Sequence, residues 1–272
     1  MSRRLTLAAS LCFAAAVLLS AQLTVVFVSG KASFRTGLSA QWKTLETGQS
    51  IGALGFVRTG PGSSVELTRR DAYRLLVSSN SLVRLEAAMP SSRASSSPDH
   101  VTILTGKILS EVMPAGKGFQ VRTQESLMGV RGTQFAVIAG SGGEALLAVK
   151  DGQVLSIDKD VQGAEPEPFI VPMGSKRQSG FGGTPQPPVR LDAGDEDYFD
   201  FAALDAMAAG KAPDTLYDHW KAGQDRLFAD FTAADLEDRR LFELEEIDSL
   251  WRFLIRENAA WREAIDSFTR GK

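Results

Sequence analysis

The sequence predicts a mainly β fold: a compact antiparallel β-sandwich or a short coil of strands, followed by an α-helical C-terminal module. Two observations support this prediction. Turn-forming residues recur every eight to fifteen residues up to position 192, with alternating apolar and polar residues between them, as is typical of strands. Beyond position 192 the apolar residues recur at helical spacing. With 272 residues, 43% of them hydrophobic, the chain is long enough for one or two packed cores.

The N-terminus has the pattern of a secretory signal peptide over residues 1–22. Arg3 and Arg4 precede an apolar stretch over 5–19, and small residues follow it. Apolar character continues to Val28, so an uncleaved membrane anchor is the alternative. In both cases the positive-inside rule places the body outside the cytoplasm. The expected location is therefore periplasmic or secreted, or inner-membrane anchored if the segment is retained.

Residues 23–192 are predicted to form the β domain. Successive β-branched or alternating stretches flank Gly- or Ser-rich turns, so we expect strand pairs at each turn. The pairs are "LTVVFVSGKASFR", "FVRTGPGSSVELTR", "YRLLVSSNSLVRLE", "HVTILTGKILSEVM" and "LLAVKDGQVLSI". The only cysteine, Cys12, lies in the apolar N-terminal stretch, so this domain is expected to be stable without a disulfide.

Residues 193–272 are predicted to form an acidic helical tail. Positions 195–272 hold 19 acidic and 10 basic residues, whereas the remainder of the chain is basic, so the two parts either attract each other or present two solvated surfaces. Thr232 is placed to cap a long helix. We expect its apolar stripe to dock on another helix or on the β body, with a partner surface as the alternative. The candidate partner surface consists of Trp220, Ile247, Leu254, Trp261 and Phe268.

One short stretch, "GVRGTQF", has the composition of an anion-binding loop. A phosphate loop of the Walker type would open a helix, whereas here a strand follows. We therefore predict a structural corner in which the glycines permit a turn, two apolar side chains point inward, the threonine bonds a turn group and the arginine is a partly buried hydrogen-bond hub. The residues are Gly129, Val130, Arg131, Gly132, Thr133 and Phe135.

Candidate catalytic and ligand-binding chemistry is sparse. The two histidines, His100 and His219, form no metal-ligand spacing and no Ser-His-Asp set. The acids of "ELEEID" lack the loop pattern of a calcium site. We expect no enzyme activity, no cofactor, no metal and, with a net charge of −3 and export, no nucleic-acid partner. A polysaccharide-binding module would need exposed aromatics, for which Trp42 and Tyr73 are the candidates.

The body resembles the extracytoplasmic FecR domain family. The resemblance rests on ordered elements: "FVSGKASFR", then "WKTLETGQSIGALGFVRTGPGSSVELT", "ILTGKILSEV", "FQVRTQESLMGVRGTQFAV" and "LLAVKDGQVLSI". The Val-Arg-Gly-Thr-x-Phe segment is the most specific of these. The chain departs from the family at "TRRDAYRLL", where a turn glycine is absent, and in the Ser-rich loop 91–98.

The resemblance implies fold more firmly than function. Family members that regulate iron uptake are membrane-spanning sigma regulators with a cytoplasmic sigma-binding segment, and we expect no such segment before the apolar stretch here. The expected role is therefore protein–protein interaction or scaffolding in the bacterial envelope, with an unknown protein partner. The alternatives are an envelope-signalling component that acts with a separate sigma regulator or receptor, and a polysaccharide-binding module.

Overall fold

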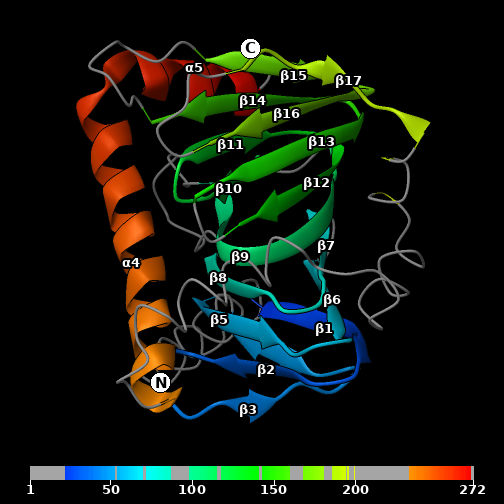
Figure 1. The fold of residues 1–272 in the computed structure, drawn as a ribbon, viewed down its shortest axis with the longest axis vertical. Coiled ribbons are helices and arrows are strands. Elements are labelled where there is room, and N and C mark those ends of the chain that lie inside the picture. Colours follow the sequence, from blue (N-terminus) through cyan, green and yellow to red (C-terminus); the bar gives the residue numbers. More distant parts are fainter. Residues whose placement is uncertain are drawn as a thin grey trace, which may run out of the picture.

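A computed structural model describes residues 22–52, 54–69, 72–86, 98–114, 118–140, 143–159, 168–180, 186–193, 195, 199 and 233–270. The expected signal segment (apart from residue 22), Trp220 and the Thr232 cap lie outside the described residues. The predicted fold class is confirmed: two β-sheets form the body, and two C-terminal helices follow (Figure 1). Among the described residues, no helix is long and apolar enough to span a membrane.

Sheet A is antiparallel throughout, with the strand order β4-β1-β6-β7-β9-β12-β13-β16-β17. Its strands are β4 (Ser50–Gly52), β1 (Gln22–Ser29), β6 (Ser64–Arg69), β7 (Tyr73–Val77), β9 (Asp99–Val112), β12 (Gln134–Ala139), β13 (Ala145–Asp151), β16 (Ser175–Ser179) and β17 (Val189–Arg190).

Sheet B has the order β3-β2-β5-β8-β9-β10-β11-β14-β15, in which only the β9–β10 pair is parallel among the described strands. Its remaining strands are β3 (Lys43–Thr44), β2 (Ala32–Arg35), β5 (Leu54–Thr59), β8 (Leu82–Glu86), β10 (Phe119–Arg122), β11 (Ser126–Val130), β14 (Gln153–Asp158) and β15 (Phe169–Pro172).

Strand β9 belongs to both sheets and joins them. Its first half pairs with β8 and β10 in sheet B, and its second half pairs with β7 and β12 in sheet A. The change occurs at Gly106, which has φ of +105°. A Cβ atom there would lie 2.1 Å from Ser81 Oγ, so only glycine fits this crossing. The sequence predicted two strands at this place, and the structure has one long bent strand.

Most of the predicted strand pairs are wrong in their pairing, although the strands themselves exist. The β1–β2, β5–β6, β7–β8 and β13–β14 connections each carry the chain from one sheet to the other, so the flanking strands do not bond to one another. Nine of the ten described residues with positive φ lie at such changes of sheet. They are Gly30, Gly48, Gly62, Asn80, Gly106, Gly118, Gly132, Gly152 and Gly174.

The core lies between the two sheets because alternate side chains of each strand point to opposite faces. Leu75 of β7 and Ile108 of β9 enter this core, whereas their neighbours Leu76 and Leu109 face outward from sheet A and form a smaller cluster with Phe199. Sheet B also has an apolar outer face. That face consists of Phe56, Leu82, Leu104, Leu127, Leu155 and Ile157.

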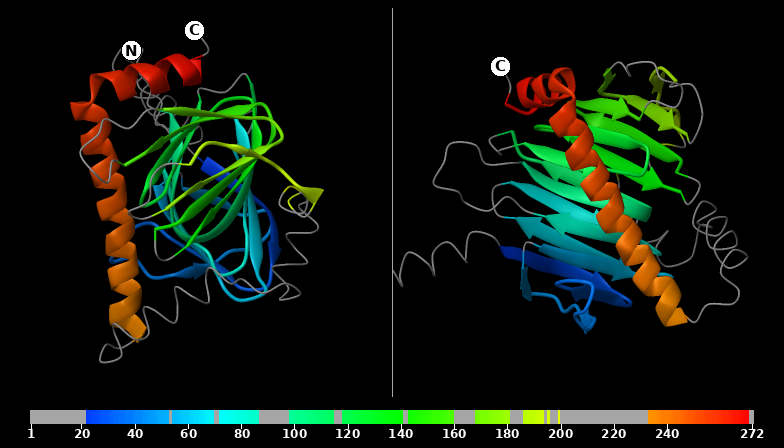
Figure 2. Two further views of the ribbon diagram at one scale, coloured as in Figure 1. Left: turned by 45° about the horizontal axis from the view of Figure 1, so that its top comes forward. Right: turned by 90° about the vertical axis from the view of Figure 1, so that its left-hand side faces the viewer.

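Helices α4 (Ala233–Glu257) and α5 (Ala259–Arg270) cover this outer face of sheet B. Figure 2 shows α4 lying across the strands and α5 turning over one end of the sheet. The predicted single long helix is wrong: Asn258 separates the two helices, and its side-chain Oδ1 accepts a hydrogen bond from the Trp261 N–H at 3.0 Å. This is the geometry of an N-cap, which ends one helix and begins the next.

Candidate functional site

A buried polar cluster among the described residues lies between α4 and sheet B. Asp248 is 1% exposed and is surrounded by side chains from three strands. We call this the Asp248 cluster. It consists of Asp248 and Arg252 from α4, Arg84 and Glu86 from β8, His100 from β9 and Arg122 from β10.

Both carboxylate oxygens of Asp248 are occupied. Oδ1 lies 3.0 Å from His100 Nε2 and accepts a hydrogen bond from Arg122. Oδ2 accepts a hydrogen bond from Arg84 and lies 2.8 Å from Arg252 of the next helical turn. Arg252 also pairs with Glu86, whose carboxylate lies 3.5 Å from Arg84. The cluster therefore ties α4 to β8, β9 and β10 by charge.

This environment fixes the ionisation state of Asp248. Burial alone would raise the pKa of its carboxyl, but the hydrogen bond from His100 and the charges of Arg122 and Arg84 outweigh that effect. The net pKa lies well below the ordinary aspartate value. Asp248 is therefore ionised beneath α4. Its attraction to the surrounding arginines offsets the free-energy cost of removing the carboxylate from water.

The pKa of His100 is also lowered, and for a base this favours the neutral form. Burial lowers the pKa of its imidazole, and the nearby Arg122 lowers it further, whereas Asp248 and Glu86 offset part of the change. The ring is therefore neutral at pH 7 and is suited to donate its single N–H to Asp248. Arg122 is buried too, which lowers its pKa, and its Nε has no hydrogen-bond partner among the described residues.

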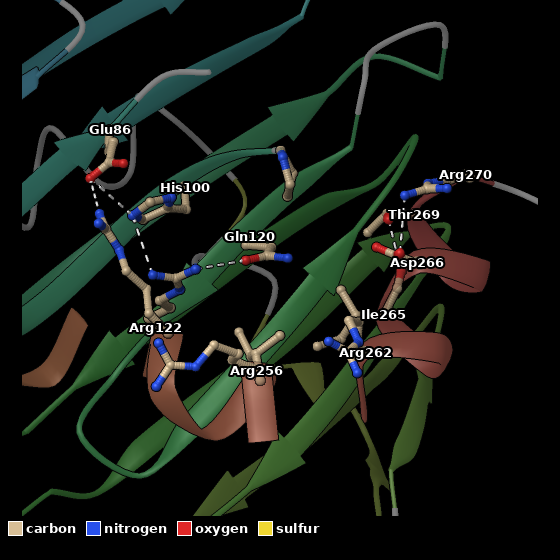
Figure 3. A pocket seen from close by; sticks show the side chains of 13 residues that line it. Glu86, His100, Gln120, Arg122, Arg256, Arg262, Ile265, Asp266, Thr269 and Arg270 are labelled. Atoms are coloured by element: carbon tan, nitrogen blue, oxygen red, sulfur yellow. Dashed lines mark hydrogen bonds and ion pairs between the residues drawn. The ribbon is translucent and has the colours of Figure 1, made fainter. Parts of the chain in front are cut away.

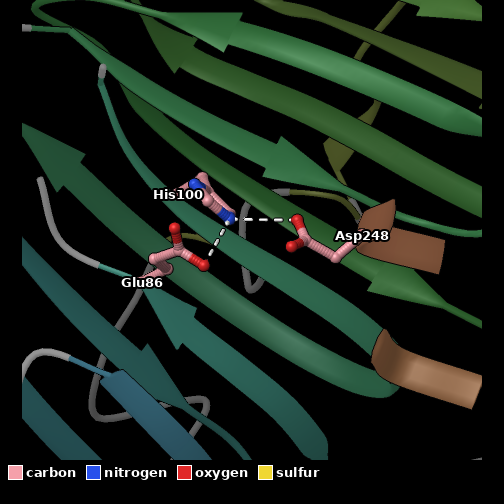
Figure 4. Close-up of side chains that lie close together, drawn as sticks. All are labelled: Glu86, His100 and Asp248. Atoms are coloured by element: carbon pink, nitrogen blue, oxygen red, sulfur yellow. Dashed lines mark ion pairs between the residues drawn. The ribbon is translucent and has the colours of Figure 1, made fainter. Parts of the chain in front are cut away.

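Glu86, His100 and Asp248 together have the donor types of a metal site, with ligand atoms within 4.8 Å of one another (Figure 4). Their surroundings argue against that use. Arg84, Arg122 and Arg252 already bind the carboxylates, and a divalent cation placed between them would meet their positive charge at close range. The chemistry of the cluster fits an electrostatic clamp better than a metal centre or an acid–base pair.

Comparison with known proteins finds a family similarity for part of the β body. The model of the protein family described as FecR protein matches residues 56–155, from β5 into β14. This segment resembles the FecR protein family. The resemblance that the sequence motifs indicated is therefore confirmed over this range. No curated protein matches the chain.

Two crystal structures of a candidate anti-sigma factor from Parabacteroides distasonis ATCC 8503 are similar in fold to this chain. Their TM-scores are 0.42 and 0.41, each at 18% sequence identity. The similarity covers 53% and 52% of this chain and 62% of each of those chains. This chain thus spans about six tenths of that protein.

The "GVRGTQF" stretch of the FecR domain forms the corner between β11 of sheet B and β12 of sheet A. Val130 and Phe135 are fully buried in the core. Thr133 Oγ1 lies 3.0 Å from the Arg131 carbonyl oxygen and 3.1 Å from that of Gln153, either of which can accept its proton. Gly132 supplies the positive φ, at +60°. The segment thus carries the chain from sheet B to sheet A.

Two residues of this corner differ from expectation. Arg131 is half-exposed, and its Nε donates to the Pro114 carbonyl at 3.3 Å, so it is a weaker tie than the predicted buried hub. Gly129 does not have a positive φ. Instead it lies under α5, where a Cβ atom would lie 3.6 Å from Thr269 Cγ2. This is an ordinary van der Waals distance, so the packing of α5 on β11 does not require a glycine here.

The described members of the predicted partner surface face sheet B rather than solvent. Ile247 and Trp261 are 7% and 6% exposed, and Leu254 and Phe268 pack partly buried in the same cluster. Trp251, which the sequence analysis did not select, is fully buried, and its Nε1 donates to the Thr123 carbonyl at 2.7 Å. The stripe docks the helices, and any partner must use other surfaces.

The Asp248 cluster was missed because nothing local marks it. Its members, from Arg84 to Arg252, lie up to 168 positions apart along the chain. Asp248 itself stands among several other acids in "ELEEID". One signal was available: Asp248 lies four positions after Leu244 and three before Trp251, which places it on the same helix face as these apolar residues. A carboxylate on that face requires cationic partners.

Proposed function

We propose that this chain is an exported, non-enzymatic FecR-domain protein that works by contacting another protein in the bacterial envelope. Residues 1–22 would be the signal peptide or anchor, 23–192 the FecR-like body and 193–272 the helical module. The match of residues 56–155 to the FecR family is the observation that carries the proposal. A FecR-type role in envelope signalling implies a protein partner and requires no catalytic site.

The internal chemistry supports this reading. The buried polar residues of the Asp248 cluster are engaged with one another and leave no nucleophile beside a free base. A polysaccharide platform is disfavoured, because Tyr73 is 4% exposed and stacks on Phe119 at a centroid distance of 4.7 Å. Trp42 is half-buried, with the Arg58 guanidinium 4.3 Å from its ring centroid.

The second candidate is an envelope-signalling component that acts through a separate sigma regulator or receptor. The match to the FecR family favours this candidate, which is a more specific form of the proposed protein–protein interaction role. A transcriptional readout separates the two: deletion of the gene should alter expression from a promoter that depends on an extracytoplasmic-function sigma factor if the protein signals. A scaffold should leave such promoters unchanged.

The direct test is site-specific photo-crosslinking of the full-length protein in cells. Probes belong on exposed side chains of the helices and of the body, such as Phe253 at 51% exposure and Ile170 at 45%. We expect at least one position to capture a defined protein and others to capture none. Uniform absence of crosslinks, or turnover of envelope substrates by the purified protein, would contradict the proposal.

Export of the protein must be measured separately, because the crosslinking experiment does not show in which compartment the protein lies. Cell fractionation and N-terminal sequencing of the mature chain should place the protein outside the cytoplasm, with cleavage near residue 22 or with the intact N-terminus in the inner membrane. A chain truncated at residue 194 would not serve as a control in the crosslinking experiment. Removal of the tail would also uncover the apolar outer face of sheet B, so a lost crosslink could reflect a change in the fold.

A further inference from the structure

A cavity of about 450 Å³ opens beside the Asp248 cluster, between sheet B and both helices. Its volume is in the range of ligand-binding cavities. The strands contribute Glu86, His100, Gln120 and Arg122, while α4 and α5 contribute arginines and isoleucines (Figure 3). We call it the arginine cavity, because its lining includes Arg122, Arg252, Arg256, Arg262 and Arg270.

Positive charge exceeds negative charge in this lining. The two carboxylates, Glu86 and Asp266, are already paired: Glu86 with Arg252, and Asp266 with Arg270 at 3.0 Å. Arg262 has no side-chain partner in the part of the chain that the structure describes. Arg256 pairs with Glu257, just outside the lining, at 2.9 Å. A concave surface that holds more guanidinium than carboxylate groups concentrates anions.

The floor of the cavity is fixed before any ligand binds. Arg122 is 5% exposed, held on one side by Asp248 and on the other by Gln120, whose Oε1 accepts a hydrogen bond from Arg122 Nη2 at 3.1 Å. Figure 3 shows Arg122, Arg256 and Arg262 around the same opening. Because the floor is already ordered, little conformational freedom remains to be lost there on binding.

We propose that the arginine cavity binds a small multivalent oxyanion that carries phosphate or carboxylate groups. Planar guanidinium groups match both oxyanions in two-pronged hydrogen bonds, and several of them from different elements favour a ligand with more than one negative charge. Ile255 and Ile265 line the same space and would contact an apolar part of the ligand. This inference is independent of the proposed partner protein.

Binding should also strengthen helix docking, because the cavity is built from sheet B, α4 and α5 together. A ligand that binds only the assembled cavity stabilises the folded protein by mass action. The test is therefore a thermal melt of the purified full-length protein with sodium pyrophosphate or sodium citrate, against sodium chloride at equal ionic strength. We expect a saturable rise in Tm with at least one of the two anions, and the one that acts identifies the ligand chemistry.

Variants separate a site from a general salt effect. Arg262→Gln removes an exposed cation that has no side-chain partner among the described residues, so the fold should be kept. The variant should weaken anion affinity by roughly tenfold, about the contribution of one charge-assisted hydrogen bond. Arg256 lines the cavity as well but is paired with Glu257 at 2.9 Å, so Arg256→Gln should weaken anion affinity less than Arg262→Gln does. Arg190→Gln, an exposed arginine of β17 far along sheet A, is the matched control and should behave as wild type.

Two results would overturn the proposal. One is a Tm that follows ionic strength alone, with pyrophosphate, citrate and chloride superimposed. The other is an anion-dependent shift that is unchanged in Arg262→Gln and in the Arg256→Gln/Arg262→Gln double variant, which would make the effect a property of the whole surface.

Discussion

Asp248 places a buried carboxylate between α4 and three strands, and its loss would leave three guanidinium groups without their shared anion. Breaking a buried charge network by removing one partner costs about 3–5 kcal/mol. We expect Asp248→Asn to lower the free energy of unfolding by that amount in a urea titration. Glu246→Gln, an exposed acid on the same helix, should stay within about 0.5 kcal/mol of wild type.

His100 makes stability depend on pH. Its pKa is lowered in the folded state, whereas the unfolded chain has the ordinary value of about 6.5. Above that pH both states are neutral and the contribution is complete. As the pH falls below about 6.5, the unfolded chain takes up the proton first, so stability is lost until the pH passes the folded-state pKa.

The expected result is a Tm that falls between pH 7 and pH 5 in wild type and falls less in His100→Gln. Asp248 does not add to this slope, because its pKa lies below its usual value and it stays ionised in both states over that range. Parallel Tm-against-pH curves for the two proteins would show that another group is responsible.

At this scale the sequence was informative where a motif is local. The FecR signature predicted a corner, and Val130, Gly132 and Thr133 lie in one. Arg131 was misjudged because the side-chain environment of a corner depends on what packs over it. The Asp248 cluster depends wholly on tertiary contacts between β8, β9, β10 and α4, which no local pattern encodes.

Among the elements, β9 is the one that both sheets share, and Gly106 is its critical position. An alanine Cβ there would meet Ser81 Oγ at 2.1 Å and Ser81 Cα at 2.5 Å, on a backbone with φ of +105°. We expect Gly106→Ala to cost more than about 2 kcal/mol in chemical denaturation, since both strain and overlap oppose it.

Gly129→Ala is the matched control for that substitution. Gly129 also lies in a buried strand, but its φ is not positive and an added Cβ would make an ordinary contact with Thr269 at 3.6 Å. It should unfold near the wild-type midpoint. Equal destabilisation of the two variants would mean that loss of glycine in any buried strand, rather than the crossing geometry, sets the cost.

Most strand boundaries were predictable from the sequence, and strand partners were not. Turn residues marked most strand ends, although Gly106 lies inside β9. A Gly turn can close a hairpin or carry the chain to the opposite sheet, and the local pattern is the same. The heptad spacing of Ile247, Leu254, Trp261 and Phe268 survived as a shared buried cluster, although Asn258 divides it between two helices.

At the scale of the whole molecule, sheet B is buried on both faces: the core lies on one side and the two helices lie on the other (Figure 2). The charge division seen in the sequence is realised locally, because Arg84 and Arg122 of the body meet Asp248 of the acidic tail. Apolar burial and ion pairs thus both hold the helices on sheet B, and the helices and the β body form one folded unit.

This predicts the effect of removing both helices. A chain that ends after residue 232 would expose the outer face of sheet B and lose the buried side chains Leu244, Trp251 and Ile265. Each fully buried large apolar side chain contributes about 1.5–3 kcal/mol, so the expected loss exceeds about 5 kcal/mol and is comparable to the whole stability of a domain. The truncated chain should bind a hydrophobic dye and should aggregate or melt far below the wild-type Tm.

A chain that ends after Arg270 is the control. If the short chain melts like wild type and binds no dye, the helices do not stabilise the body, and their docking would have to be a separable, weakly held state.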